Sequence, residues 1–310
     1  MRGALSLRPT YYEALRRLTL QLSGVQMGSD HAFLVETRLS SLARKEGFEN
    51  LEAMVQELFS VGKSRLAIQV VSALVERDTH FNRDPKSLDT LFKTVLPELV
   101  EKRGGGRIDL LSYGCGSGQD IYSIAIRARY AAARAMMGPV ALHMTGVDYP
   151  SQALERARAG RYTHFEAQRG LSARDLIANF TPDLAPGSTD WLVAAHLQEN
   201  VTFKEMHLMA GAEELDDFHI VMFRGAIGHY SRSARVRVIR SLTKVLRPYG
   251  YLILGSGEDL QDKYSELEPV PGTPGLYRRL KFEPVAEPVG KQPNGRTTFE
   301  GSKPQQAASN

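Results

Sequence analysis

Three alternate glycines, Gly114, Gly116 and Gly118, form the stretch of the 310-residue sequence with the clearest chemical meaning. An apolar run from Asp109 leads into them and an amphipathic segment follows, which predicts a strand, a tight loop and a helix. Glycines allow a sharp turn and let a ligand approach the backbone with no Cβ in the way, and the start of a helix offers unpaired N–H groups. On its own the loop is compatible with a nicotinamide-dinucleotide site, a methyl-donor site or a simple turn.

Asp148 and the glycine spacing favour the methyl donor among these alternatives. The spacing is Gly-x-Gly-x-Gly, whereas a pyrophosphate site has Gly-x-Gly-x-x-Gly. Asp148 follows the next apolar run, Leu142–Val147, and a carboxylate there can accept both hydrogen bonds of a ribose diol. Its structural alternative is a charge or cap before a helix that begins at Ser151. No Gly-Lys-Ser/Thr sequence follows a strand, which disfavours a triphosphate.

Strands that alternate with helices must position these residues from about Arg107 onward. This alternation predicts a parallel sheet with helices on both faces. Segment Arg161–Glu199 breaks the rhythm and is interpreted as an insertion, and residues from about Glu283 onward are polar enough to predict a disordered tail. The predicted strands are Ile108–Ser112, Leu142–Val147, Val201–Lys204, His219–Phe223, Tyr251–Gly255 and Leu276–Phe282, and the predicted helices are Ile121–Ala135, Ser151–Ala159 and Arg232–Val245.

The first hundred residues are predicted to be helical. Leu15, Leu18 and Leu22 share one helix face, and Val35, Leu39 and Leu42 share another. Ser29 or Asp30 is a candidate cap of the second helix, Gly47 its candidate end and Asn50 the candidate cap of a third. The other face of the second helix carries Arg38, Arg44 and Lys45. A solvated face is the simpler interpretation, and a docking surface for an acidic helix is the functional one.

Composition limits the class of protein. Hydrophobic residues make up 42% and charged residues 24%, as in a globular protein with a core. No apolar run is long enough to cross a bilayer and no secretory signal is present, so we expect a cytoplasmic protein without membrane insertion. Cys115 is the only cysteine, and the histidines lack metal-site spacing, so no metal is expected. The net charge of +4 is modest, and no nucleic-acid partner is expected.

Several further motifs occur in a fixed order along the chain. They are Tyr12 to Val25, Arg38 to Phe48, the box Asp78-Thr79-His-Phe81-Asn82-Arg83-Asp84-Pro85, the loop Gly114 to Ile124, Gly146-Val-Asp148 with Ala153 to Tyr162, Val221 to Arg224, and Leu246 to Glu258. As an ordered set they resemble the CheR-type chemotaxis receptor methyltransferases, which are protein-glutamate O-methyltransferases. The resemblance covers about Tyr11 to Phe282.

The resemblance implies a Rossmann-like class I methyltransferase domain of the α/β class, with a mostly parallel twisted sheet flanked by helices. A small all-α domain precedes it. We place the helical domain at residues 1–75, a linker helix region at 76–100, the methyltransferase domain at 101–282 with a candidate insertion subdomain at 161–199, and the tail at 283–310. The implied cofactor is S-adenosylmethionine, with S-adenosylhomocysteine as product. The implied role is signal transduction in chemotaxis, and the implied partner is a chemoreceptor-like protein whose acidic helical segment carries the methylated glutamates.

The resemblance also assigns site residues. Thr79 and Arg83 would lie at the domain junction against the methyl donor. Arg83 would orient the acceptor carboxylate, and His229 or Tyr230 would donate a second hydrogen bond to it. The remaining contacts implied for the donor are Gly114, Gly116, Gly118 and Gln119 at its methionine end, Asp148 at its ribose, His207 and Leu208 near its adenine, and Arg224 with Gly225 at the end of the following strand.

Five positions depart from the family pattern. Gln119 replaces an acidic residue, His207 and Gly225 each replace asparagine, His229 replaces tyrosine and Asn82 replaces an aromatic residue. Three alternatives follow: a family member with altered contacts, a methyltransferase for a different small-molecule or protein O or N substrate, or a regulatory protein that binds S-adenosylmethionine or S-adenosylhomocysteine without turnover. A nicotinamide oxidoreductase is disfavoured by the loop spacing.

Overall fold

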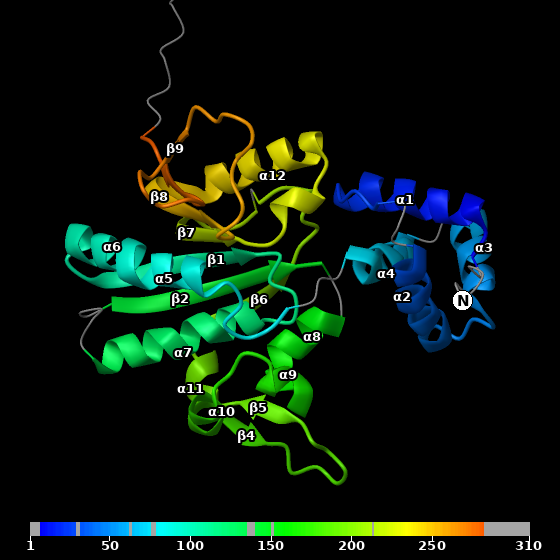
Figure 1. Ribbon diagram of the computed structural model, residues 1–310, viewed down its shortest axis with the longest axis horizontal. Helices are drawn as coiled ribbons and strands as arrows, with labels where there is room; N and C mark the ends of the chain where they lie inside the picture. Colours follow the sequence, from blue (N-terminus) through cyan, green and yellow to red (C-terminus); the bar gives the residue numbers. More distant parts are fainter. Residues whose placement is uncertain are drawn as a thin grey trace, which may run out of the picture.

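The computed structural model describes residues 7–28, 32–61, 64–75, 79–134, 140–149, 152–212 and 214–281. The predicted tail and the candidate caps Ser29, Asp30 and Ser151 lie outside these residues. Four helices form the N-terminal part: α1 (Pro9–Ser23), α2 (Ala32–Lys45), α3 (Leu51–Val61) and α4 (Ser64–Val75). Figure 1 shows them as a group beside the sheet, with α1 reaching toward its edge.

The helical part has its own core. Leu15, Val35 and Leu39 are fully buried there, so the predicted apolar faces of α1 and α2 are confirmed. The Oδ1 of Asn50 accepts a hydrogen bond from the backbone N–H of Ala53 at 2.9 Å, which confirms the predicted cap of α3. Such a cap stabilises a helix by about 1 kcal/mol because it satisfies an otherwise unpaired N–H.

The central sheet has seven strands in the order β6-β2-β1-β7-β8-β10-β9. The first five strands are parallel to one another, and Figure 1 shows β2, β1, β7 and β8 among them. Strand β10 pairs antiparallel with β8, and β9 pairs antiparallel with β10. This arrangement confirms the predicted α/β fold. The strands are β1 (Gly106–Tyr113), β2 (Val140–Asp148), β6 (Val201–Glu205), β7 (Phe218–Phe223), β8 (Leu246–Leu254), β9 (Leu267–Pro269) and β10 (Leu276–Arg279).

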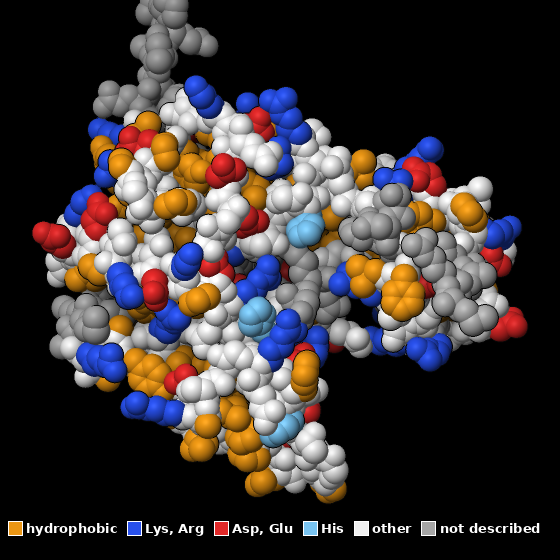
Figure 2. All heavy atoms as spheres, in the orientation of Figure 1, with side chains coloured by type: hydrophobic (Ala, Val, Ile, Leu, Met, Phe, Trp, Pro, Cys, Tyr) orange, Lys and Arg blue, Asp and Glu red, His pale blue; other side chains and the backbone are white. Residues whose placement is uncertain are grey.

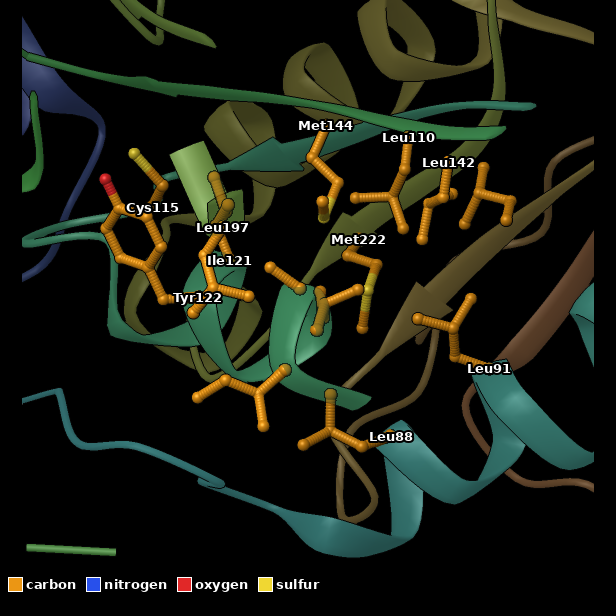
Figure 3. Packing of buried hydrophobic residues seen from close by; sticks show 14 of the residues in the cluster. Leu88, Leu91, Leu110, Cys115, Ile121, Tyr122, Leu142, Met144, Leu197 and Met222 are labelled. Carbon is orange, nitrogen blue, oxygen red and sulfur yellow. The ribbon is translucent and has the colours of Figure 1, made fainter. Parts of the chain in front are cut away.

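Helices cover both faces of this sheet because alternate strand residues point to opposite sides. Leu110 of β1 belongs to the core on one side and Leu111 to the core on the other. Figure 3 shows Leu88 and Leu91 extending toward the strand residues on the first side. The first face is covered by α5 (Pro85–Thr90), the short π-helix η2 (Leu91–Val95), α6 (Leu96–Arg103) and α7 (Gln119–Ala133), and the second by α12 (Arg232–Val245). The region expected as linker helices thus packs on the sheet.

The segment predicted as an insertion forms a small lobe, shown below the sheet in Figure 1. Its three strands pair antiparallel in the order β3-β5-β4. Tyr162 anchors the lobe: its ring packs edge-on against Phe81 at 5.0 Å, and its hydroxyl donates to the carbonyl of Ser117 at 2.5 Å. The lobe therefore supports the glycine loop from behind. Its elements are β3 (Arg161–Tyr162), α9 (His164–Gln168), α10 (Ala173–Asn179), β4 (Phe180–Pro182), β5 (Trp191–Val193) and α11 (Ala195–Gln198), and α8 (Gln152–Ala159) precedes them.

Among the described helices, none combines the length and the apolar character that crossing a membrane requires.

Candidate functional site

A cavity of about 270 Å³ lies between the helical part and the C-terminal ends of β1, β2 and β7. The strand order reverses between β1 and β7, and open α/β sheets bind ligands at such a switch point. Nine of the site residues predicted for the donor and acceptor line the cavity together: Thr79, Arg83, Gly114, Gly116, Asp148, Leu208, Arg224, His229 and Tyr230. We call this space the donor cavity below.

The glycine loop has the left-handed backbone that only glycine adopts easily, with φ of 74° at Gly114, 55° at Gly116 and 81° at Gly118. A Cβ on Gly116 would lie 3.1 Å from the Cγ2 of Thr79, so the loop and Thr79 pack closely at the cavity wall. A Cβ on Gly118 would instead meet Ala157 at 2.8 Å. Gly118 is thus explained by the packing of α8 against the loop and does not line the cavity.

Asp148 is fixed against the glycine loop. Its Oδ2 accepts a hydrogen bond from the N–H of Gly116 at 2.6 Å, and its Oδ1 accepts one from the N–H of Tyr149 at 2.7 Å. Strand β2 ends at this residue, so the carboxylate projects from the edge of the sheet where the donor cavity opens. A carboxylate held by backbone N–H groups keeps one orientation without competing side-chain rotamers.

Gln119 faces inward, away from the donor cavity. Its side chain is 1% exposed, and its Oε1 accepts hydrogen bonds from the hydroxyls of Thr79 and Ser117. The carboxylate on the cavity wall belongs to the next residue, Asp120, which lies 2.9 Å from the Nη2 of Arg224. Asp120 is not among the site residues predicted from the sequence. Its position in the first turn of α7, directly after the glycine loop, could have indicated it.

Arg224 ties the end of β7 to the segment around Arg83. Its side chain is 5% exposed, and its Nη1 donates to the carbonyl of Arg83 at 3.1 Å and to the Oγ of Ser87 at 2.6 Å. Asn82 and Asp84 flank Arg83 with left-handed φ of 51° and 47°. Asparagine and aspartate tolerate this region better than other non-glycine residues. The backbone conformation therefore suits asparagine at position 82, where the family has an aromatic residue.

Asp84 is held on the other side of the same segment. Its Oδ2 accepts a hydrogen bond from the N–H of Ser256 at 2.7 Å. Burial alone would raise the pKa of Asp84, but the hydrogen bonds from Ser256 and Ser87 and the nearby charge of Arg224 outweigh it and hold the pKa below the ordinary value. The carboxylate stays ionised at neutral pH and fixes the loop after β8 to the start of α5.

Glu258 joins the loops that follow β7 and β8. Its Oε2 accepts hydrogen bonds from the N–H groups of Gly225 at 2.7 Å and Gly255 at 2.9 Å. Its Oε1 accepts from Ala226 at 2.9 Å and Ile227 at 3.0 Å. Four backbone donors on one carboxylate hold both loops in a single arrangement, and such charge-assisted bonds are stronger than neutral ones.

His229 and Tyr230 are bound to the end of α1 through the backbone. The N–H of Gln26 donates to the carbonyl of His229 at 2.8 Å, and Val25 and Tyr230 form a β-bridge. His229 is exposed at the cavity, whereas Tyr230 is 4% exposed and packs against Phe223. Of the two candidates for a hydrogen bond to the acceptor, His229 has the accessible side chain.

The remaining predicted residues divide between the cavity and its surroundings. Leu208 lines the cavity, and its carbonyl accepts a hydrogen bond from the hydroxyl of Tyr113. The ring of His207 packs edge-on against Tyr149 at 5.0 Å, and burial lowers the pKa of this histidine. His207 is outside the cavity wall, and Gly225 lines a neighbouring groove.

Comparison with known proteins points to one family. The family model described as "CheR methyltransferase, SAM binding domain" matches residues 77–276. The "Chemotaxis protein methyltransferase 1" of Pseudomonas aeruginosa is 28% identical over 271 residues, which cover 87% of this chain and 97% of that protein. The "Chemotaxis protein methyltransferase Cher2" of Pseudomonas putida is also 28% identical, over 87% of this chain and 98% of that protein.

The donor cavity has the chemistry that S-adenosylmethionine requires. A bare glycine backbone, a fixed carboxylate at the end of β2 and a second carboxylate at the start of α7 all face it. These groups suit an elongated ligand with a diol and an ammonium group. The chain belongs to the CheR methyltransferase family and is an S-adenosylmethionine-dependent methyltransferase.

Proposed function

We propose that the protein esterifies glutamate carboxylates of chemoreceptor-like proteins. The observation that carries this proposal is the position of Arg83, which lines both the donor cavity and the adjacent groove. A guanidinium group matches a carboxylate with two parallel hydrogen bonds. The similarity to chemotaxis protein methyltransferases over 87% of the chain supports the same acceptor class.

The donor contacts follow from the cavity wall. We assign the ribose diol to Asp148, the adenine to the neighbourhood of Leu208, and the methionine end to Gly114 and Gly116. For the ammonium group we assign Asp120, because Gln119 is buried and already accepts two hydroxyl hydrogen bonds. The change from an acidic residue to Gln119 therefore leaves a carboxylate available to the donor.

The chemistry requires alignment more than acid–base catalysis. S-adenosylmethionine supplies a methyl group on a positively charged sulfur. The acceptor carboxylate oxygen forms a bond to the methyl carbon while the carbon–sulfur bond breaks and its electron pair stays on sulfur, so no proton moves. A glutamate side chain is already ionised at neutral pH. The contribution of Arg83 and His229 is to hold its oxygen about 3–3.5 Å from the methyl carbon.

The acceptor partner is a helical segment rich in acidic residues. On α2, Arg44 and Lys45 are exposed, while the Nη1 of Arg38 donates to the carbonyl of Leu74 at 2.8 Å and its side chain lines the donor cavity. We assign initial docking to Arg44 and Lys45. Charge reversal at both should weaken methylation of a receptor fragment at low salt. Unchanged methylation would remove α2 from the docking surface.

The experiment that tests the function supplies tritiated S-adenosylmethionine and purified cytoplasmic fragments of chemoreceptors. Incorporated label that base releases as methanol is expected for a carboxyl methyl ester. Base-stable label would indicate a different O or N acceptor. Donor binding without any transfer would favour a regulatory protein. The Asp148→Ala variant is the control, and it should abolish donor binding.

A further inference from the structure

A second cavity, of about 480 Å³, adjoins the donor cavity and shares Arg83, Arg224 and His229 with it. It lies beyond the C-terminal ends of β7 and β8, and α/β proteins bind ligands at the C-terminal ends of their parallel strands. We call it the glycine groove, because four of its lining residues are Gly225, Gly228, Gly255 and Gly257.

Contacts within the chain explain two of these glycines. A Cβ on Gly225 would collide with the guanidinium group of Arg83, and a Cβ on Gly255 would lie 2.7 Å from the Oε2 of Glu258. At Gly228 and Gly257 a Cβ would meet nothing within 4 Å, and neither residue has the left-handed φ that favours glycine. Neither backbone conformation nor internal packing requires glycine at these two positions.

The carboxylates in the walls of the groove are bound to backbone donors. Asp84 accepts from the N–H of Ser256, and Glu258 accepts from four N–H groups of the two loops. An anionic side chain that enters the groove therefore meets carboxylates already compensated by hydrogen bonds. Arg83 also lines the groove, and its guanidinium group lies against Gly225 of the groove wall.

We propose that the glycine groove binds the acceptor, with the glutamate side chain passing Gly228 and Gly257 and its carboxylate meeting Arg83. This assignment rests on the proposed function. In-line displacement requires the acceptor oxygen and the departing sulfur on opposite sides of the methyl carbon. Two cavities that meet at Arg83 provide the two sides. A wall without side chains lets the backbone of a helical acceptor segment approach closely.

The test fills the groove without touching the donor cavity. Gly228→Leu and Gly257→Leu each add a side chain where a Cβ would meet no atom within 4 Å, and neither position has the left-handed φ that disfavours leucine. Ala132→Leu is the control, because it adds the same side chain at an exposed position of α7. Ala132 is thirteen residues from Gln119, where α7 begins beside the glycine loop, which corresponds to about 20 Å along the helix. Each variant is titrated with S-adenosylhomocysteine by calorimetry and assayed with tritiated donor and a chemoreceptor cytoplasmic fragment.

The expected result separates an effect on donor binding from an effect on acceptor binding. Both glycine variants should bind S-adenosylhomocysteine like the wild type, which also shows that they fold, and should lose about tenfold or more in kcat/KM for the receptor fragment through a raised KM. Ala132→Leu should keep both values. Unchanged kcat/KM in both glycine variants, with an active wild type, would overturn the groove assignment alone. A wild type that binds donor and methylates no receptor fragment would overturn the proposed function and the groove assignment with it.

Discussion

The guanidinium group of Arg83 occupies the space that a β-carbon on residue 225 would need, with its Cζ 2.8 Å from the ideal Cβ position of Gly225. Any residue with a β-carbon at position 225, including the asparagine that the family resemblance implies there, would collide with Arg83 in this position. The glycine lets the arginine lie across the end of β7, between the two cavities.

We expect Gly225→Ala to displace Arg83 and to reduce methyl transfer about tenfold or more, because a displaced Arg83 would no longer align the acceptor oxygen with the methyl carbon. The φ of 62° at Gly225 adds a backbone penalty of about 1 kcal/mol. Gly47→Ala is the matched control, because Gly47 has a φ of 79° and open space around its Cβ position. Methyl-transfer kinetics and urea unfolding of both variants separate the backbone penalty of the left-handed φ from the effect of the collision with Arg83. Equal behaviour of the two would mean that Arg83 moves aside without consequence.

Glu258→Gln should be strongly destabilising and should lower kcat. A glutamine side chain offers one acceptor oxygen, so two of the four backbone N–H groups would face an NH2 group. Each unsatisfied buried donor costs about 1–3 kcal/mol. Glu101→Gln, at an exposed position of α6, should change the free energy of unfolding by less than about 0.5 kcal/mol. Denaturant unfolding at pH 7 measures both, and a Glu258→Gln protein as stable and active as the wild type would contradict the bridging role.

Asp120→Asn should weaken binding of S-adenosylhomocysteine about tenfold or more, because a charge-assisted hydrogen bond to the ammonium group is lost. Methylthioadenosine lacks the amino-acid end of the donor, so its affinity should change little. Calorimetric titration of both ligands makes the comparison. A parallel loss for both ligands would indicate that Asp120 acts by holding Arg224, 2.9 Å away, and not by contacting the ammonium group.

His219 should make the protein less stable in mild acid. Burial and then the charges of Arg103 and Arg247 lower the pKa of His219 from 6.5 to about 4, and its Nδ1 accepts a hydrogen bond from the N–H of Asp109 at 3.0 Å. The unfolded chain takes up a proton below pH 6.5, while the folded protein does so only near pH 4. Stability is therefore lost as the pH falls between these values, by up to about 1.4 kcal/mol per pH unit.

Urea unfolding between pH 7.5 and pH 4.5 tests this expectation. A His219→Asn variant keeps an oxygen for the N–H of Asp109 and does not titrate. Its unfolding free energy should fall less steeply with pH than that of the wild type. Identical slopes would assign the acid sensitivity to other groups.

The periodicity of the sequence predicted most of the elements, because strand and helix patterns are local. The predicted helix Arg232–Val245 matches α12 at both ends. Strand β8 begins at Leu246, five residues before the prediction, because α12 runs directly into it. The sequence predicts a linker helix region at residues 76–100, and within it Leu88, Leu91 and Val95 are fully buried against the sheet.

The site was harder to predict wherever a role depends on orientation. Gln119 and Asp120 are neighbours in the sequence, and only the rotation of α7 decides which one faces the cavity. Glu258 accepts hydrogen bonds from backbone N–H groups of two loops. Every residue except proline has such a group, so the sequence does not indicate which residues are its partners. The positions of the glycine loop and of Asp148 could be predicted because the loop follows β1 and Asp148 ends β2, and both strands have a clear apolar pattern. Their contacts with the donor stay a prediction.

The join between α1 and the segment at His229 consists of main-chain bonds: Gln26 N–H to the His229 carbonyl, and Ser231 N–H to the Gly24 carbonyl, each at 2.8 Å. Nearly any amino acid can supply a main-chain bond, so the seam does not depend on the side chains of Gln26, His229 or Ser231. Two kinds of substitution would still disrupt it. Proline at position 26 or 231 lacks the donor, and a side chain at Gly24 is excluded because its φ is 71° and an added Cβ would collide with Ala234. Without the helical part the donor cavity would lose the wall that Gln26, Leu34 and Leu74 help to form, so its enclosure depends on both parts of the chain.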